Sequence, residues 1–208
     1  MANINTFKSK LKGGGARANQ FEVHMNFPTW AGNSSVAEEM TFLCTSTTTP
    51  ASTVSEVPVA FRGRTLYLAG DRTFDTWSTT VINDTDFKIY RAVEEWLNGM
   101  NDLKLNTSSH IDPDSYMVDA YIKHLDRNNA LLKSWTFRGV FPTALPGIAL
   151  DYGTNDAIET FDVTWRYQWF ETDVGAPAVG KSSSQIREES TATNIQATAN
   201  KRGSGYQE

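Results

Sequence analysis

Residues 161–169, FDVTWRYQW, alternate apolar and polar side chains at every position. Strict alternation predicts a β-strand with one buried face, because successive side chains of a strand point to opposite sides of the sheet. The apolar set is mostly aromatic, and aromatic residues are enriched in strands that pack against a core. This stretch therefore indicates a mainly β fold and predicts Phe161 and Trp165 as core residues.

Shorter alternating stretches lie on both sides of this one. Residues 21–27, 118–122 and 131–140 each read as a strand, and residues 41–45 read as another. Two further strands are expected on either side of Arg62-Gly63-Arg64, which has the composition of a tight turn. The residues that we predict for the core are Phe21, Trp96, Trp135, Phe137, Phe161 and Trp165.

One segment changes the period from two to that of a helix. Phe87, Tyr90, Val93, Leu97 and Met100 recur at helical spacing, with charged residues on the opposite face. Asn and Asp before them suit a helix N-terminus. We therefore predict a single helix at about residues 84–99, and we interpret the polar stretch 28–39, around its tryptophan, as a loop.

Composition divides the chain into three regions. Residues 1–17 carry four basic side chains and no acid, and a glycine triplet at 13–15 suggests a flexible basic arm. Residues 18–172 hold the strands and the helix, as one domain. Residues 173–208 are rich in Ala, Ser, Thr and Gln, and such a composition cannot offset the entropy of ordering by itself. We expect a polar, low-complexity C-terminal extension.

The charge and the cysteine count exclude several classes of function. The net charge is −5, and the domain between the arm and the extension is acidic, which disfavours binding of a nucleic-acid duplex. Cys44 is the sole cysteine, so no internal disulfide can form. The apolar stretches are too short to span a membrane, and no signal peptide is visible, so we expect synthesis in a cytoplasm.

Sequence patterns of catalytic sites are absent. His24, His110 and His124 have no metal-ligand spacing, and Cys44 has no neighbouring pattern that would activate a thiolate. The sequence contains no G-x-S-x-G elbow, and the glycine triplet at 13–15 lacks the Lys-Ser/Thr of a P-loop. We expect no catalytic, metal or cofactor site, and therefore no enzyme.

Four stretches in a fixed order carry a resemblance to a known family. They are residues 70–77, residues 81–84 leading into the helix that ends at Trp96-Leu97, residues 135–142 with 150–152, and residues 158–167. In this order they resemble the tail tube proteins of contractile-tailed bacteriophages, which are related to the tubes of type VI secretion systems and bacteriocins. The resemblance covers roughly residues 18–170. The long loop around Trp30 and the extension beyond residue 175 depart from the family pattern.

The resemblance implies a β-barrel or sandwich with one flanking helix. It implies six copies per ring, stacked rings, and inner strands that form one continuous barrel around a bore. The implied partners are further copies of the chain, the tail sheath, the tape-measure protein, and the baseplate and tail terminator proteins. Genome DNA would pass through the bore without sequence-specific binding, and the protein would reside in the virion tail.

Two alternatives and two site hypotheses complete these expectations. The chain could instead form the tube of a type VI secretion or other contractile injection system, or be a soluble β-barrel binding module. In the arm, Ile4, Phe7 and Leu11 are expected to order against an adjacent ring. The acids that we expect to line the bore lie opposite the apolar set of their strands, and they are Glu22, Asp119, Glu159 and Asp162.

Overall fold

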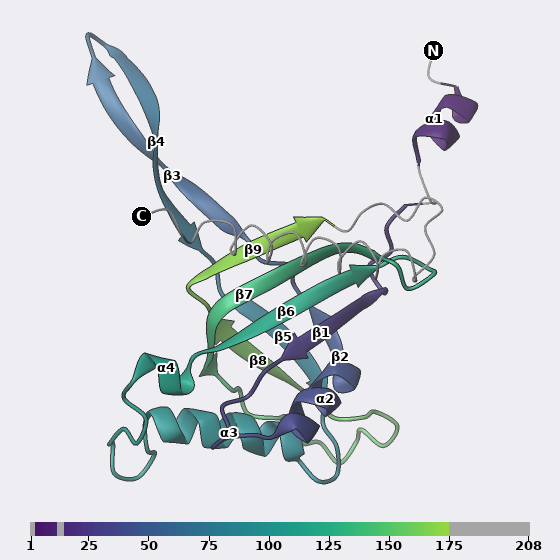
Figure 1. Cartoon of the computed structure of the whole chain (residues 1–208), viewed down its shortest axis with the longest axis vertical. Helices are drawn as coiled ribbons and strands as arrows, with labels where there is room; N and C mark the ends of the chain where they lie inside the picture. The colour runs from purple at the N-terminus through teal and green to yellow at the C-terminus, as the bar shows by residue number, and fades with distance from the viewer. Residues whose placement is uncertain (1–2, 12–14, 175–208) are drawn as a thin grey trace, which may run out of the picture.

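The computed structural model describes residues 3–11 and 15–174 (Figure 1). The described strands are β1 (Phe21–Met25), β2 (Cys44–Thr47), β3 (Ser52–Phe61), β4 (Arg64–Phe74), β5 (Trp77–Ile82), β6 (Val118–Leu125), β7 (Leu131–Ala144), β8 (Thr160–Arg166) and β9 (Trp169–Val174). The helices are α1 (Ile4–Lys10), α2 (Ser34–Leu43), α3 (Lys88–Met100) and α4 (Pro113–Tyr116). The fold is mainly β, as the sequence predicts.

Two antiparallel half-sheets form a sandwich, and β7 belongs to both. The first half-sheet has the order β1-β6-β7-β9, and the second has the order β7-β8-β5-β2. Residues 133–138 of β7 pair with β9, whereas residues 141–144 pair with β8. Between these parts the strand bends at Gly139, whose φ is +63°. A Cβ there would lie 2.9 Å from Gln168 Cγ, so a glycine suits this bend.

Aromatic side chains fill the space between the half-sheets. Trp77 stacks on Phe137 with 4.4 Å between ring centroids, and Trp96 from α3 packs against Trp165 at 5.7 Å. The indole Nε1 of Trp165 donates a hydrogen bond to Oγ1 of Thr79, at 2.9 Å. Thr79 is the buried polar residue among the described ones, so this bond satisfies it.

The structure places the predicted core residues at two depths. Trp96, Phe137, Phe161 and Trp165 are buried. Phe21 and Trp135 are half-buried and pack against the edge of the core. Helices α2 and α3 lie together at one end of the sandwich, below both half-sheets in Figure 1, and their apolar faces complete the core.

Two local interpretations were wrong. The stretch expected as a loop at 28–39 contains the start of α2, and the expected strand at 41–45 begins only at Cys44. The Asn33 side chain accepts a hydrogen bond from the Val36 amide at 3.2 Å and so caps the helix, while Val36 and Met40 face the core. The chain thus has more than the single flanking helix that was predicted.

Other boundaries shift by a few residues. The predicted helix at 84–99 is α3, which begins at Lys88 after a turn, with Phe87 at a φ of +52°. Within the expected arm, residues 4–10 form α1, capped by Asn3. Strand β9 continues past residue 172, the boundary that was set for the domain. Gly13, Gly14 and the extension from residue 175 onward lie outside the described residues.

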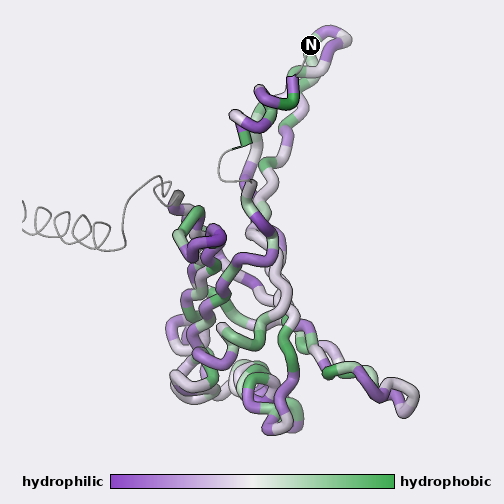
Figure 2. Tube along the Cα trace, turned by 90° about the vertical axis from the view of Figure 1, so that its right-hand side faces the viewer, coloured by the Kyte–Doolittle hydropathy of each residue, from purple (hydrophilic) through white to green (hydrophobic). Residues whose placement is uncertain are grey.

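Strands β3 and β4 form a long hairpin that extends away from the sandwich (Figures 1 and 2). Arg62 and Gly63 at its tip both have positive φ, as a two-residue hairpin turn requires, so the turn expected here is present. At the base, the Phe74 ring packs against Tyr167 and Phe170 of the sandwich. Among residues 3–11 and 15–174, the hairpin is therefore anchored at its base.

Candidate assembly surfaces

The hairpin has one apolar face. Antiparallel pairing sets Val57 opposite Leu68 and Val59 opposite Leu66, which places these four side chains on the same side of the ribbon. Their side chains are between 42% and 58% exposed, and Phe61 near the tip is 67% exposed. Figure 2 shows the hairpin as a ribbon of mixed hydropathy that stands clear of the sandwich. An apolar strand face of this length that no described residue covers indicates an interaction surface.

The first half-sheet has two open edges. Within the described residues, β1 pairs only with β6, and β9 pairs only with β7. Unpaired edge strands offer their N–H and C=O groups to any further strand. Each step from β1 to β6, β7 and β9 is antiparallel, so β1 and β9 also run in opposite directions. The two edges can therefore pair with each other, between copies that have the same orientation.

The outer face of the first half-sheet is charged. Glu22 lies opposite Lys123 on neighbouring strands, and their charged groups are 3.9 Å apart. Arg138 bridges strands by pairing with Asp119 of β6 and, at 3.2 Å, with Glu171 of β9. The side chains of these two carboxylates hold the pKa of Arg138 above its usual value through hydrogen bonds and charge attraction. Asp173 adds another acid on the same strand as Glu171.

The four acids expected in the bore are divided between surfaces. Glu22 and Asp119 lie on the outer face of the first half-sheet, and Asp119 also accepts a hydrogen bond from the Gly139 amide at the β7 bend. Asp162 lies on the outer face of the second half-sheet and accepts a hydrogen bond from Thr80 at 2.6 Å. Glu159 precedes β8 and accepts a hydrogen bond from the Asn83 side chain. The structure therefore does not gather the four on one face.

Two of the expected arm residues, Ile4 and Phe7, lie on an exposed face of α1, and the third, Leu11, is its C-cap. Ile4 and Phe7 are separated by three positions, and Leu11 follows four positions later. Their exposed fractions are 69%, 64% and 46%, and no residue of α1 is buried. The structure brings the three together on one face, as helical geometry dictates.

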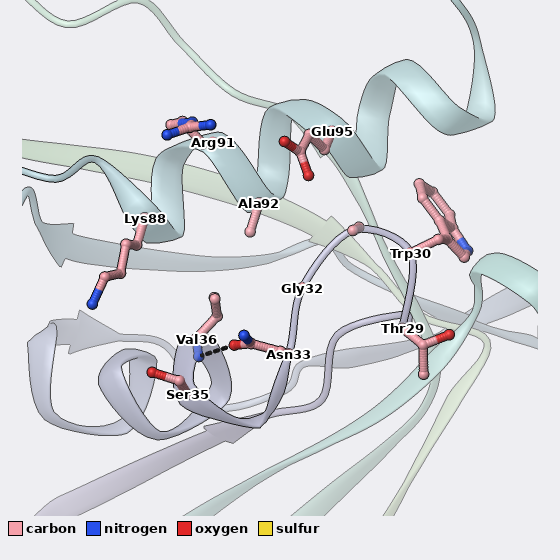
Figure 3. A pocket seen from close by; sticks show the side chains of 11 residues that line it. Thr29, Trp30, Gly32, Asn33, Ser35, Val36, Lys88, Arg91, Ala92 and Glu95 are labelled. Atoms are coloured by element: carbon pink, nitrogen blue, oxygen red, sulfur yellow. Dashed lines mark hydrogen bonds between the residues drawn. The ribbon is translucent and has the colours of Figure 1, made fainter.

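A polar pocket of about 390 Å³ separates α2 from α3 (Figure 3). Lys88 and Arg91 project from α3 on one side, and the Asn33 cap of α2 lies on the other. Lys88 Nζ lies 2.7 Å from Oε1 of Glu39, and this carboxylate raises the lysine pKa by hydrogen bonding and charge attraction. Trp30 closes one end of the pocket and packs so tightly on Gly99 that a Cβ would overlap its ring.

The histidines and the cysteine all have structural contacts. His24 stacks on Tyr121 and His110 stacks on Trp30, whereas His124 bonds to the Arg17 carbonyl oxygen at 2.8 Å. Burial raises the pKa of the Cys44 thiol to about 12, so it stays protonated and inert. Among residues 3–11 and 15–174, no three or more His, Cys, Asp or Glu side chains cluster as metal ligands do.

Membrane insertion by a helix has no support in the described part of the chain, where no helix combines the length and the apolar content of a bilayer span.

Sequence reasoning missed two of these surfaces. It placed strands at 57–61 and 65–68 but did not assign their apolar face to an interface, although the alternation was visible. It also did not separate β9 from β8, because the alternation of residues 161–169 runs through Gln168 without a break. In the structure the Gln168 amide bonds to the Arg138 carbonyl, and the chain turns there toward β7.

Comparisons with known families and proteins agree with this arrangement. The family model described as "Phage tail tube protein" matches residues 16–173. The tail tube protein of Serratia phage KSP90 is 31% identical over 169 residues, which cover 80% of this chain and 95% of that protein. The tail tube protein gp19 of Enterobacteria phage T4 is 30% identical over 157 residues, covering 75% of this chain and 91% of that protein.

Solved structures share the fold at lower identity. A chain in the cryo-EM structure of the anti-feeding prophage cap, a tube-terminating cap, superposes with a TM-score of 0.56 at 17% identity. The match covers 77% of this chain and 91% of that one. A chain of the sheath–tube complex of an extracellular contractile injection system, PVC in its extended state, gives a TM-score of 0.51 at 13% identity, with 84% and 99% covered.

Proposed function

This chain belongs to the phage tail tube protein family, and from that premise we propose that its copies close into hexameric rings which stack into the inner tube of a contractile tail. It is a structural protein of the virion tail, as its relatives are. The observation that carries the proposal is the apolar face of the β3–β4 hairpin, which has no cover within the described chain. In a polymer, a neighbouring copy covers that face.

The open edges of the first half-sheet support ring closure. Copies related by a rotation axis that runs along the strands keep the same orientation, so β9 of one copy meets β1 of the next. Because β1 and β9 are antiparallel within one copy, this seam continues the antiparallel pattern of the sheet. Closure then leaves no free edge on the first half-sheet, which removes the hazard of uncontrolled pairing there.

In such a ring the outer face of the first half-sheet becomes the wall of the bore. Glu22, Asp119, Glu171 and Asp173 outnumber Lys123 and Arg138 among the charged side chains described above. A wall with an excess of acids repels DNA phosphates, which carry one charge per roughly 1.7 Å of duplex. We propose that the genome crosses this bore without adhering, after the tape-measure protein has left it. The sheath is the proposed outer partner, with baseplate and terminator proteins at the two ends.

Electron microscopy of the purified full-length chain tests the proposal. Rings or tubes in negative stain are expected, together with a high mass in size-exclusion chromatography with light scattering. A protein that stays monomeric at every concentration, and that binds a small ligand saturably, would instead support a soluble binding module. That result would overturn the assignment to a tube.

A paired substitution locates the surface that carries assembly. Leu66→Ser with Leu68→Ser removes apolar contacts from the exposed hairpin face, so we expect tubes to be lost while the circular dichroism spectrum is kept. Thr53→Ser with Thr73→Ser is the matched control at the hairpin base, and it should form tubes as the parent does. Equal tube yields from both variants would show that this face is not an interface.

The acidic bore has its own test. Glu22→Lys reverses a charge on the proposed wall, whereas Asp162→Lys makes the same change on the other half-sheet. In assembled particles, the first change should slow genome ejection, and more so at low salt, because screening over a Debye length of about 8 Å weakens the attraction at physiological salt. If only Asp162→Lys slows ejection, the second half-sheet lines the bore. If neither variant slows it, the acidic-bore proposal fails.

A further inference from the structure

Helix α1 is a short amphipathic helix whose side chains are not buried by any described residue. Its seven residues bury none of their side chains, and its apolar stripe of Ile4, Phe7 and Leu11 is open to solvent. Isolated helices shorter than about 12–15 residues are marginal in water, so a helix of this length depends on a surface that covers its stripe. We therefore looked for a surface that could cover the apolar stripe of α1.

Charge narrows the choice of surface. Lys8 and Lys10 lie in the last turn of α1, and residues 3–11 contain no acid. A complementary surface needs an apolar floor for the stripe and acids at its rim for the lysines. It should also lack cations, because like charges brought together at an interface oppose binding.

A groove beside α3 has these properties. Leu97, Leu103 and Leu145 provide an apolar floor, and Glu94 and Glu95 stand on the helix at its rim. The groove has a volume of about 460 Å³, and Leu103 is 95% exposed. Neither glutamate has a salt bridge within the described residues. We call this the α3 groove.

Two other hollows in the described part of the chain fit α1 less well. The pocket between α2 and α3 shares Glu95 with the α3 groove, but it also presents Lys88 and Arg91, which would repel the lysines of α1 (Figure 3). The hollow around Phe42 and Glu38 borders β1, the strand whose edge ring closure uses. Of these three hollows, the α3 groove is the best match in both charge and hydropathy.

The helix α1 and the α3 groove lie at opposite ends of the sandwich (Figure 1). In Figure 1, α1 projects beyond the same end of the sandwich as the β3–β4 hairpin, whereas α3 closes the other end. A copy stacked head to tail on the first would therefore bring its α3 groove toward α1. We infer that α1 of one copy docks in the α3 groove of a copy in the adjacent ring, an inference that rests on the proposed stacking of rings.

Charge reversal tests the pairing. Lys8→Glu with Lys10→Glu, and separately Glu94→Lys with Glu95→Lys, should each reduce tube yield at least tenfold while ring formation is unchanged. Combining all four changes restores opposite charges across the contact, so tube yield should recover. Recovery in the combined variant supports the docking, and a combined variant that is as defective as its parents overturns it. Electron microscopy counts the tubes, and light scattering measures the rings.

Cross-linking gives a positional test. Cys44 can remain, because burial and a pKa raised to about 12 keep its thiol from reacting. Phe7→Cys with Leu103→Cys should give covalent multimers when assembled tubes are oxidised. Phe7→Cys with Ser35→Cys is the control for the α2–α3 pocket and should give none. If tubes form but only the control pair cross-links, or neither pair does, the docking inference fails and the tube function stands. If the parent chain forms no tube, the function itself fails.

Discussion

Strand β8 and the β3–β4 hairpin have the same sequence pattern and opposite burial. In β8 the alternating set of Phe161, Val163 and Trp165 is buried. In the hairpin the alternating set that includes Val59 and Leu66 is about half exposed. Alternation thus predicts that one face of a strand is covered, but not whether the cover comes from the same chain. In the sandwich the same chain covers the apolar face. For the hairpin, we propose that another copy covers it.

This contrast separates two kinds of stability. Side chains between the half-sheets stabilise the fold of each copy, so their loss should lower the free energy of unfolding. Side chains on the free hairpin face contribute little to that free energy and are expected to act in assembly. Substitutions in the core should therefore change the free energy of unfolding, and substitutions on the hairpin face should change assembly.

Truncation of Trp165 should have the largest effect. Trp165→Ala empties a fully buried site and leaves Thr79 without its hydrogen-bond donor. Loss of a buried aromatic side chain typically costs about 3–5 kcal/mol. Chemical denaturation followed by tryptophan fluorescence and circular dichroism measures this change. A thermal melting point within about a degree of the parent would remove Trp165 from the core.

The bend in β7 should show an intermediate effect. Gly139→Ala places a Cβ at a φ of +63° and 2.9 Å from Gln168 Cγ, so we expect a loss of about 1–2 kcal/mol. Gly147→Ala is the control, since its Cβ would meet nothing within 4 Å. Equal unfolding midpoints for the two variants would show that the bend does not depend on glycine.

A change on the hairpin face should have the smallest effect on the single chain. Leu66→Ser alters a side chain that is 58% exposed, and surface substitutions usually stay within about 0.5 kcal/mol. The measurement is urea unfolding at concentrations where rings and tubes are absent. A loss of unfolding free energy comparable to that of Trp165→Ala would mean that the hairpin folds back onto its own chain. The hairpin face would then stabilise the single chain as the core does.

The sandwich strands could be predicted because local pattern and burial agree there. Residues 161–166 face a core on one side and solvent on the other, so the period of two is visible in the sequence. Helix α2 could not be found in this way, because Thr41 and Phe42 favour strands locally. Its Asn33 cap and the spacing of Val36 and Met40 were present as signals, and tertiary packing decided between the two.

The assembly surfaces were only partly predictable. The apolar stripe of α1 follows from residue spacing, since Ile4, Phe7 and Leu11 recur at helical intervals. The distribution of the four expected acids over two half-sheets could not be predicted in this way. A polar residue in an alternating strand indicates an outer face, but the pattern does not show to which half-sheet the strand belongs. Only strand pairing, which joins residues far apart in the chain, distinguishes Glu22 from Asp162.

The continuous course of β7 through both half-sheets has a mechanical consequence. A force on β6 and β9 is transmitted along the backbone of β7 to β8, which pairs with it, and not only through the side chains between the half-sheets. Stretching or twisting one layer must therefore displace the other, and the two layers are joined at the bend at Gly139. In a wall built from such units, shear between the two layers would have to deform β7 in every copy.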